Sequence, residues 1–384
     1  MMTTIPAMLD MLPAFMVPFF TLQYPIDTPE VDFWPNASYY GTGPKDIYIV
    51  ITCIAVMAIF RDFSRVCVLE PFARWKLTRD LDRRIAKREA NGNGNGNGSA
   101  LNGSAMGNGK VNGMANGNGN GHAIHANGHA LATPHSPKQT KRIHRSVLRF
   151  AEQGYQFIYY TLQWCYGFYV HRNLPTRVLD PTDVWLGYPH LPLAGPLKFY
   201  YLTQTAFYTH QILVLNAEAR RKDHYQMLAH HIITVALMGA SYFLNFTRVG
   251  CLIMVIMDWC DIFFPLAKMT SYLSISQTLT DIIFGFWVLS WAVTRHVLFI
   301  FVMLSTYNDP PRFIKYEWAP ERGWFVTTNT MRMFNVMLFA LQILQIIWGT
   351  MIARIAWRVI VGTSGASDDR SDDEDDGSAE KKEE

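Results

Sequence analysis

The chain has 384 residues, of which 49% are apolar, 14% aromatic and only 17% charged. Because soluble domains average about 25% charged residues, this composition argues against two ordinary soluble domains. The formal net charge of +3 says little as a total. Its distribution is informative, because basic residues are concentrated in 61–90 and 137–149, whereas acidic residues are concentrated in 368–384.

Seven mostly apolar segments approach the length of about 20 residues that a transmembrane helix needs. The sixth and seventh are the most apolar, while the second and third are rich in aromatic residues. The sequence therefore predicts an all-α polytopic membrane protein with about seven transmembrane helices. The expected spans are 46–61, 152–170, 197–216, 227–246, 249–267, 278–304 and 332–360.

The flanking charges predict how the chain is oriented in the membrane. Clusters of Lys and Arg follow the first span, precede the second and follow the third. Since such clusters remain on the cytosolic side, the N-terminal segment 1–45 and the loops 171–196 and 305–331 are expected in the lumen, and the C-terminus in the cytosol. Residues 1–30 contain no Lys or Arg, so we expect the first span, rather than a signal peptide, to direct insertion.

Two polar stretches are expected to be disordered and cytosolic. Residues 62–144 are basic and then rich in Asn and Gly, and residues 361–384 form an acidic tail. Asn36, in an Asn-Ala-Ser sequon on the expected lumenal side, is predicted to be glycosylated. Ser371 precedes three acidic residues and is predicted to be phosphorylated by an acidophilic kinase.

Four ionisable residues in two neighbouring spans are the candidate catalytic groups. His230 and His231 lie near the start of the fourth span, and Asp258 and Asp261 lie in the fifth. A charge at the centre of a membrane costs at least about 2.5–3.5 kcal/mol, so four such residues indicate chemistry rather than isolated core contacts. The i, i+3 spacing places both carboxylates on one helix face. A tight turn at 245–248 joins the two spans, and at about 1.5 Å per residue both pairs fall towards the cytosolic half.

A carboxylate beside an imidazole can fix its tautomer and raise its basicity, which suits a general base or an acyl-accepting histidine. Two other enzyme classes are less consistent with the sequence. Di-iron lipid hydroxylases and fatty-acid elongases depend on histidine boxes, and the HxxHH box is absent.

Residues 230–273 resemble the signature block of ceramide synthases, a group within the TLC-domain family. The resemblance covers about 145–360 and implies a TLC catalytic domain, a barrel of six helices made by spans two to seven, with one extra N-terminal helix. The matching positions are His230-His231, Ser241-Tyr242, Asn245, Arg248-Val249-Gly250, Asp258, Asp261, Ala267-Lys268 and Tyr272.

The resemblance implies transfer of a fatty acyl group from acyl-CoA to the amine of a sphingoid base, dihydrosphingosine or phytosphingosine, in the endoplasmic reticulum membrane. Acyl-CoA is a co-substrate, and neither a metal nor another cofactor is expected. His230, His231, Asp258 and Asp261 would be catalytic, by resemblance. The substrate-binding candidates are Tyr242 and Asn245, with Arg220, Arg221 and Lys222 as candidates for binding the CoA phosphates. It is equally consistent with the sequence that these three basic residues only set the orientation of the chain in the membrane.

The segment between the first two spans departs from the pattern of many animal members of the family. Many animal members carry a homeobox-like segment between the first two spans, where this chain has its Asn/Gly-rich tract. We therefore expect no nucleic-acid binding, and the neighbouring basic residues meet anionic membrane lipid or set the topology. A homodimer or a small accessory subunit stays open as a partner, and the alternative function is a non-enzymatic TLC-domain protein that binds lipid or assists translocation.

Overall fold

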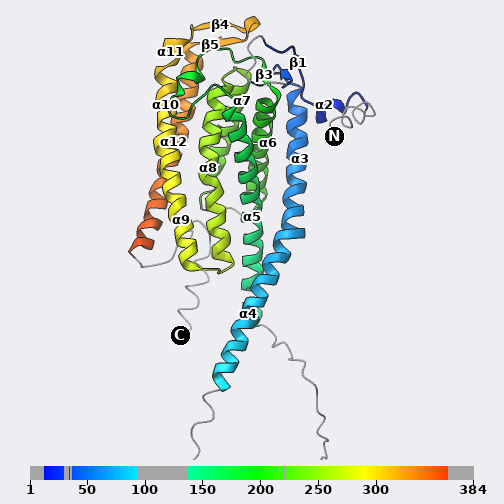
Figure 1. Cartoon of the computed structure of the whole chain (residues 1–384), viewed down its shortest axis with the longest axis vertical. Helices are drawn as coiled ribbons and strands as arrows, with labels where there is room; N and C mark the ends of the chain where they lie inside the picture. Colours follow the sequence, from blue (N-terminus) through cyan, green and yellow to red (C-terminus); the bar gives the residue numbers. More distant parts are fainter. Residues whose placement is uncertain (1–12, 30–33, 35–36, 94–135, 219–221, 362–384) are drawn as a thin grey trace, which may run out of the picture.

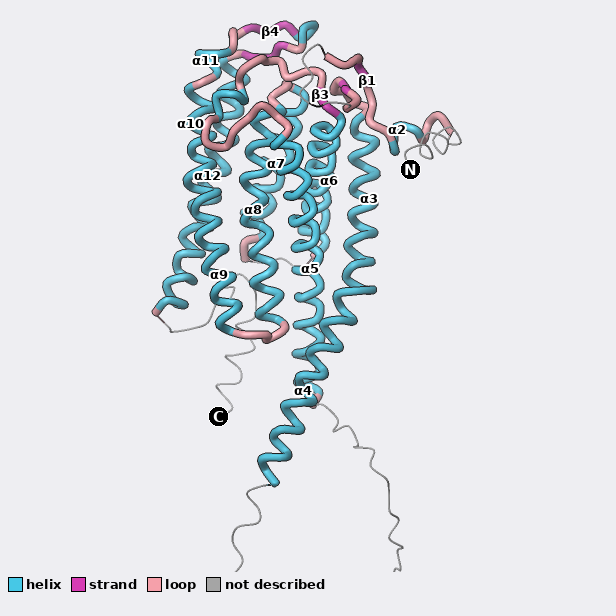
Figure 2. The backbone as a smooth tube through the Cα atoms, in the orientation of Figure 1, coloured by secondary structure: helices cyan, strands magenta, loops and turns pink. Residues whose placement is uncertain are grey.

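The computed structural model describes residues 13–29, 34, 37–93, 136–218 and 222–361. Most of these residues are helical, with five short strands at one end (Figure 2). The Asn/Gly-rich tract, the acidic tail, Asn36, Arg220, Arg221 and Ser371 lie outside the described residues. The glycosylation, phosphorylation and disorder expected there stay predictions.

The described residues contain seven long helical segments, which run side by side except where α4 (Glu70–Asn93) extends beyond the bundle (Figure 1). Short helices, α2 (Val17–Phe20), η2 (Pro181–Val184), α11 (Pro310–Phe313) and η4 (Pro320–Arg322), lie in the connections. The long segments are α3 (Asp46–Phe63) continuing through η1 (Ser64–Leu69) into α4 (Glu70–Asn93), α5 (Pro137–Arg172), α6 (Gly195–Ala217), α7 (His224–Phe243), α8 (Thr247–Tyr272), α9 (Gln277–Ala292) continuing through η3 (Val293–Leu298) into α10 (Phe299–Asn308), and α12 (Thr328–Ile360).

Six of these segments close a ring. Helix α5 packs on α6, α6 on α7, α7 on α12, α12 on α9 and α10, α9 on α8, and α8 back on α5. Helix α3 stands outside the ring, against α6. The structure therefore confirms an all-α polytopic membrane protein, with the six-helix barrel and extra N-terminal helix that the resemblance implies.

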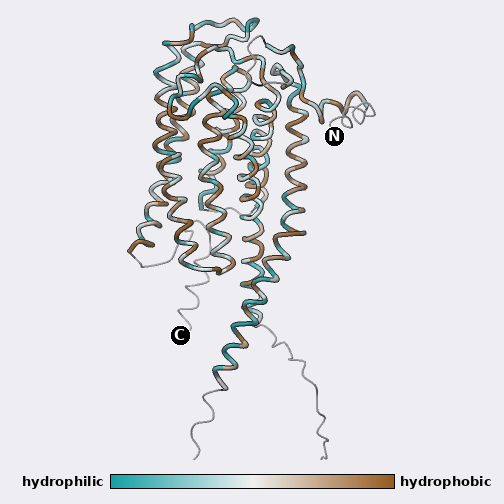
Figure 3. The backbone as a smooth tube through the Cα atoms, viewed as in Figure 1, coloured by the Kyte–Doolittle hydropathy of each residue, from teal (hydrophilic) through white to brown (hydrophobic). Residues whose placement is uncertain are grey.

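Four helices of the described part are long and apolar enough to cross a membrane by length and composition alone, namely Asp46–Asn91, Thr247–Tyr272, Gln277–Asn308 and Thr328–Ile360. Figure 3 shows the contrast between the apolar α3 and the hydrophilic α4. The expected spans in α5, α6 and α7 lie beside these four helices but are more polar. Helices α5, α6 and α7 bury the polar side chains of Gln163, Gln204, His210 and His231. These side chains lower the hydropathy of the three helices although neighbouring helices enclose them.

Two of the differences from the expected helix boundaries have a clear structural cause. The expected disordered linker is helical at 62–93 and again from 137, because Leu69 of η1 and Ala73 of α4 are buried against Val147 of α5. The fourth span ends at Phe243 rather than at 246, because Asn245 has a φ of 62°, in the left-handed region that Asn tolerates better than most residues.

The strands gather at one end of the barrel, which we call the cap; the opposite end, where α7 begins, is the base. Strands β1 (Pro25–Ile26), β2 (Tyr39–Tyr40) and β3 (Leu193–Ala194) form an antiparallel sheet in that order. Strands β4 (Glu317–Ala319) and β5 (Trp324–Val326) form a hairpin. The cap therefore combines the three segments that the charges assign to the lumen.

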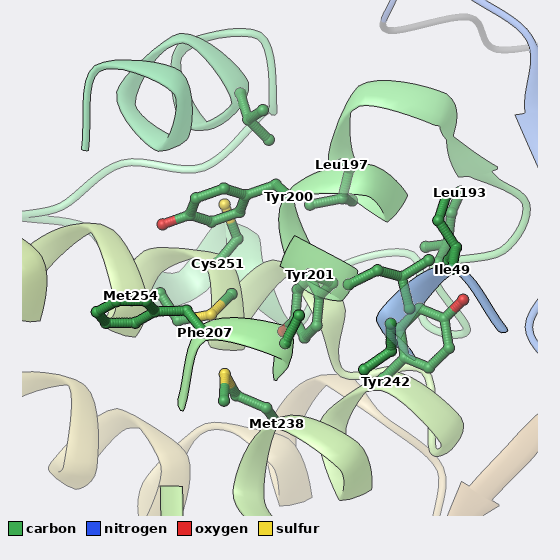
Figure 4. Packing of buried hydrophobic residues seen from close by; sticks show 14 of the residues in the cluster. Ile49, Leu193, Leu197, Tyr200, Tyr201, Phe207, Met238, Tyr242, Cys251 and Met254 are labelled. Carbon is green, nitrogen blue, oxygen red and sulfur yellow. The ribbon is translucent and has the colours of Figure 1, made fainter. Parts of the chain in front are cut away.

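A buried ion pair fastens α3 to the barrel at the cap. The ammonium group of Lys198 lies 2.7 Å from Asp46 Oδ1, and the two side chains are 0% and 2% exposed. Lys198 Nζ also donates to the carbonyl oxygens of Gln23 and Gly41, and the Tyr242 hydroxyl donates to Asp46 Oδ2 at 2.7 Å. Ile49, Tyr201 and Tyr242 pack in the apolar core of the same region (Figure 4).

We predict that Lys198→Met lowers the free energy of unfolding in detergent by about 3–5 kcal/mol, because it leaves the Asp46 carboxylate buried without its counter-charge. The matched control is Lys45→Met, whose side chain is exposed beside Asp46 and which should change stability by less than about 0.5 kcal/mol. Equal effects of the two variants would contradict the assigned role.

His190 in the cap loop predicts a dependence of stability on pH. Its side chain is 7% exposed, and burial together with nearby Arg248 lowers its pKa from the ordinary 6.5 to about 3. Below pH 6.5 the His190 imidazole takes up a proton in the unfolded chain but stays neutral in the folded cap. Its contribution to the free energy of unfolding is therefore present above pH 6.5 and is lost as the pH falls towards 3. His190→Gln should therefore flatten the fall in melting temperature between pH 7 and 5, and exposed His144→Gln should not.

Candidate active site

An apolar cavity lies inside the barrel, between α7, α8, α10 and α12, with about 820 Å³ of open space including its mouth. Along α12 it extends from Met331 to Gln345, which is about 21 Å at 1.5 Å per residue. Towards the cap its walls include Trp185, Phe246 and Thr306. Its long apolar shape suits a hydrocarbon chain.

The other end of the cavity is polar, with His230, Tyr208 and Arg295 in its lining. The rings of His230 and His231 are 5.4 Å apart, centre to centre, and His230 also contacts the Trp348 ring at 5.4 Å. The Nδ1 atoms of both histidines are buried without a hydrogen-bond partner among the described residues. These imidazoles are therefore not committed to structural hydrogen bonds through Nδ1.

Asp258 is held by two uncharged hydrogen-bond donors. Its side chain is 1% exposed. Gln204 Nε2 donates a short hydrogen bond to Oδ2, and the Tyr208 hydroxyl donates to Oδ1 at 3.2 Å. Both donors come from α6, where a spacing of four residues places them on one helix face.

Asp261, one turn further along α8, is paired with a cation instead. Arg295 Nη2 lies 2.8 Å from Asp261 Oδ2 and also donates to the carbonyl oxygen of Met257 at 3.0 Å. Arg295 belongs to the π-helical turn η3, a feature that occurs often at functional sites. The two carboxylates thus share a helix, as their spacing predicts, but bind different neighbours.

The structure brings the four predicted catalytic residues into one region without direct contact between the two pairs. No hydrogen bond within the described chain joins either carboxylate to either imidazole. Tyr208 lies between them, since its hydroxyl binds Asp258 and its ring is 5.8 Å from that of His231. The expected histidine–carboxylate contact is therefore replaced by a tyrosine bridge.

Three residues of the site were missed by the sequence analysis: Gln204, Tyr208 and Arg295. Arg295 is a charge inside the most apolar region, so the argument applied to the histidines and aspartates would have found it. Gln204 and Tyr208 carry no such signal, because a neutral polar residue in a span is ordinary.

The predicted substrate-binding residues that the structure describes lie away from the cavity lining. The hydroxyl of Tyr242 binds Asp46, and Asn245 Nδ2 donates to the carbonyl oxygen of Gly323 at 2.8 Å in the cap. These contacts favour structural roles for both. Lys222 is exposed just before α7 at the base, whereas Arg220 and Arg221 are not described.

Metal ligation has no support in the described part of the chain, where no three His, Cys, Asp or Glu side chains are grouped to hold an ion. The arrangement offers an imidazole at the end of an apolar cavity, a hydrogen-bonded carboxylate and an ion pair. These groups suit nucleophilic or general-base chemistry on an acyl group.

A family model described as the TLC domain, of the TRAM, LAG1 and CLN8 group, matches residues 149–354. Sphingosine N-acyltransferase lag1 of Schizosaccharomyces pombe is 38% identical over 234 residues, which cover 61% of this chain and 59% of that protein. Ceramide synthase FUM18 of Gibberella moniliformis is 34% identical over 258 residues, 60% of each chain. Human ceramide synthase 5 is 32% identical over 228 residues, which cover 59% of this chain and 55% of that protein.

The different partners of the two carboxylates predict different effects on stability. Asp261→Asn leaves the guanidinium of Arg295 buried without a counter-charge and should lower the unfolding free energy by about 3 kcal/mol. Asp258→Asn keeps one acceptor for its two neutral donors and should cost about 1 kcal/mol. Denaturation of both variants in detergent measures this difference, and equal losses would contradict the assignment of partners.

Proposed function

The chain belongs to the TLC-domain family, and on that premise we propose that it is a ceramide synthase, which moves a fatty acyl group from acyl-CoA to the amine of a sphingoid base. The observation that carries this proposal is the apolar cavity that ends at His230. The hydrocarbon chain lies in the cavity and the thioester lies at His230. The enzyme works in the endoplasmic reticulum membrane with its N-terminus in the lumen and its C-terminus in the cytosol.

In the proposed mechanism His230 is the nucleophile. A ring nitrogen attacks the thioester carbon, the carbon–sulfur bond breaks, and the CoA thiolate that leaves takes the proton from the other ring nitrogen of His230. The free amine then attacks the acyl-imidazole, and His231 accepts the proton that the amine loses. Formation of the amide releases the His230 ring, which takes that proton from His231 and returns to neutral imidazole. The alternative is direct transfer, in which a histidine only takes the proton from the amine.

The remaining polar residues position these groups. Asp258 holds the Tyr208 hydroxyl, and the Tyr208 ring packs against the imidazoles. The ion pair of Asp261 and Arg295 keeps η3 against α8 beside the cavity. Exact placement of reacting groups is worth several kcal/mol in such reactions, so residues that touch no substrate still affect the rate.

The CoA moiety is expected at the base, where α7 begins. Arg220, Arg221 and Lys222 precede His230 by ten, nine and eight residues, and Lys and Arg are the usual partners of phosphate groups. Glycosylation of Asn36, phosphorylation of Ser371 and a dimer or accessory subunit remain parts of the proposal.

A non-enzymatic member of the family that binds lipid is the second candidate function. The cavity alone would serve such a protein equally well. A lipid carrier, however, gains nothing from two buried imidazoles beside a hydrogen-bonded carboxylate, which are costly to place in a membrane. The polar end of the cavity therefore favours an enzyme.

We predict that the purified protein forms ceramide from acyl-CoA and a sphingoid base, and that His230→Ala and His231→Ala each lower the rate by at least about 10²-fold. Exposed His144→Ala at the base is the matched control and should retain full activity. Product is measured by mass spectrometry with several acyl-chain lengths. Wild-type protein that binds acyl-CoA without releasing ceramide would favour the lipid-binding alternative.

The covalent route makes a separate prediction. Incubation with acyl-CoA alone should add one acyl group to a peptide containing His230, and this adduct should disappear when the sphingoid base is added. Direct transfer instead predicts normal turnover with no adduct at any time after mixing.

A further inference from the structure

One face of α12 lines the cavity from the cap to the polar end. Phe334, Leu338, Leu341 and Gln345 all contribute to the lining, at intervals of four, three and four residues that place them on a single stripe. Trp348 follows three residues later and contacts the His230 ring. Gln345 is thus the polar member of an otherwise apolar stripe, at the end where His230 lies.

The amide nitrogen of Gln345 is buried without a hydrogen-bond partner among the described residues. The side chain is 1% exposed, and its Nε2 atom forms no hydrogen bond with any described residue. Folded proteins rarely leave a buried amide donor unsatisfied, so such a group calls for an explanation. Gln342, one turn earlier on α12, is also buried, but its Nε2 lies 2.9 Å from His296 Nδ1.

The missing partner is therefore expected in the cavity. An amide donor requires an acceptor, and the proposed reaction brings an acyl carbonyl oxygen to this end of the cavity. Thr234 stands one turn along α7 from His230 and lines the same cavity, and its buried hydroxyl has no partner in the described part of the chain. Two unsatisfied polar side chains thus face one apolar space beside the proposed nucleophile.

We propose that the side-chain amide of Gln345 donates a hydrogen bond to the carbonyl oxygen of the fatty acyl group and stabilises the negative charge that this oxygen acquires during attack. The charge forms as the carbonyl π electrons move to oxygen, and it disappears when the double bond returns and the thiolate leaves. Gln345 neither gains nor loses a proton. This inference rests on the function proposed above and adds an oxyanion donor to it.

The stabilising effect is greatest in the transition state, because the oxygen carries more charge there than in the thioester. Loss of the donor should therefore lower kcat, with little change in the KM for acyl-CoA. Loss of a mainly structural residue would instead lower the melting temperature, and loss of a contact to a sphingoid hydroxyl would raise the KM for the sphingoid base.

The test compares Gln345→Met with Gln342→Met in the full-length protein, with acyl-CoA and sphingoid base as substrates. Gln345→Met should lower kcat by about 10²-fold without lowering the melting temperature, because it removes an unsatisfied amide. Gln342→Met breaks the contact with His296, and it should lower the melting temperature but retain kcat.

Three results would overturn the inference while the wild-type protein makes ceramide: an unchanged kcat in Gln345→Met, a change confined to the KM for the sphingoid base, or equal losses of kcat and stability in both variants. Absence of ceramide from the wild-type protein would instead refute the proposed function, and the oxyanion role with it.

Discussion

The structure of the site depends on how two carboxylates are accommodated inside an apolar bundle. In a membrane interior a carboxylate needs hydrogen bonds or a counter-charge, because water is not there to provide them. Helix α8 carries both groups, and each one binds a different neighbour: Asp258 binds α6 through Gln204 and Tyr208, and Asp261 binds η3 through Arg295. The hydrogen bonds of Asp258 and the ion pair of Asp261 thus hold α6, α8 and η3 together around the cavity.

The same demand explains why polar chemistry and an apolar cavity lie together. Once Asp258 and Asp261 are satisfied by α6 and η3, His230 and His231 of α7 are left with buried Nδ1 atoms that bind no other residue the structure describes. The cap adds a second, distant fastening, since the Lys198–Asp46 pair ties α3 to α6. The barrel elements are therefore held together near the polar end of the cavity, and α3 is fastened to the outside of the barrel at the cap.

The sequence shows most clearly those polar residues whose burial in an apolar segment is costly. A charge in an apolar segment is conspicuous, which is why His230, His231, Asp258 and Asp261 were identifiable, and the resemblance over 230–273 added the barrel. Prediction from the sequence failed where burial of a residue costs little free energy or depends on its partners in the fold. Helix α4 looked like linker because its apolar contacts with α5 are few and spaced, and Tyr208 and Gln204 are too ordinary in a span to stand out.

Tyr242 and Asn245 illustrate a different limit. Both match the motif that suggests the family, and a motif position was taken to be a substrate contact. Their observed partners are Asp46 and the carbonyl oxygen of Gly323, so a fixed spacing can equally reflect the fastening of a cap. A match to the motif therefore indicates that a residue has a role, and only its contacts in the structure show whether that role is structural or in substrate binding.

The geometry also separates the two adjacent histidines. Neighbouring residues on an α-helix point about 100° apart, so His230 and His231 cannot both face the same space. His230 lines the cavity and contacts Trp348 of α12, whereas the His231 ring lies closer than that of His230 to Tyr208 on α6. A chain lying in the cavity therefore meets His230, while His231 stands nearer the tyrosine that binds Asp258. This division supports His230 as the acyl carrier and His231 as the proton acceptor, because each role needs a different neighbour.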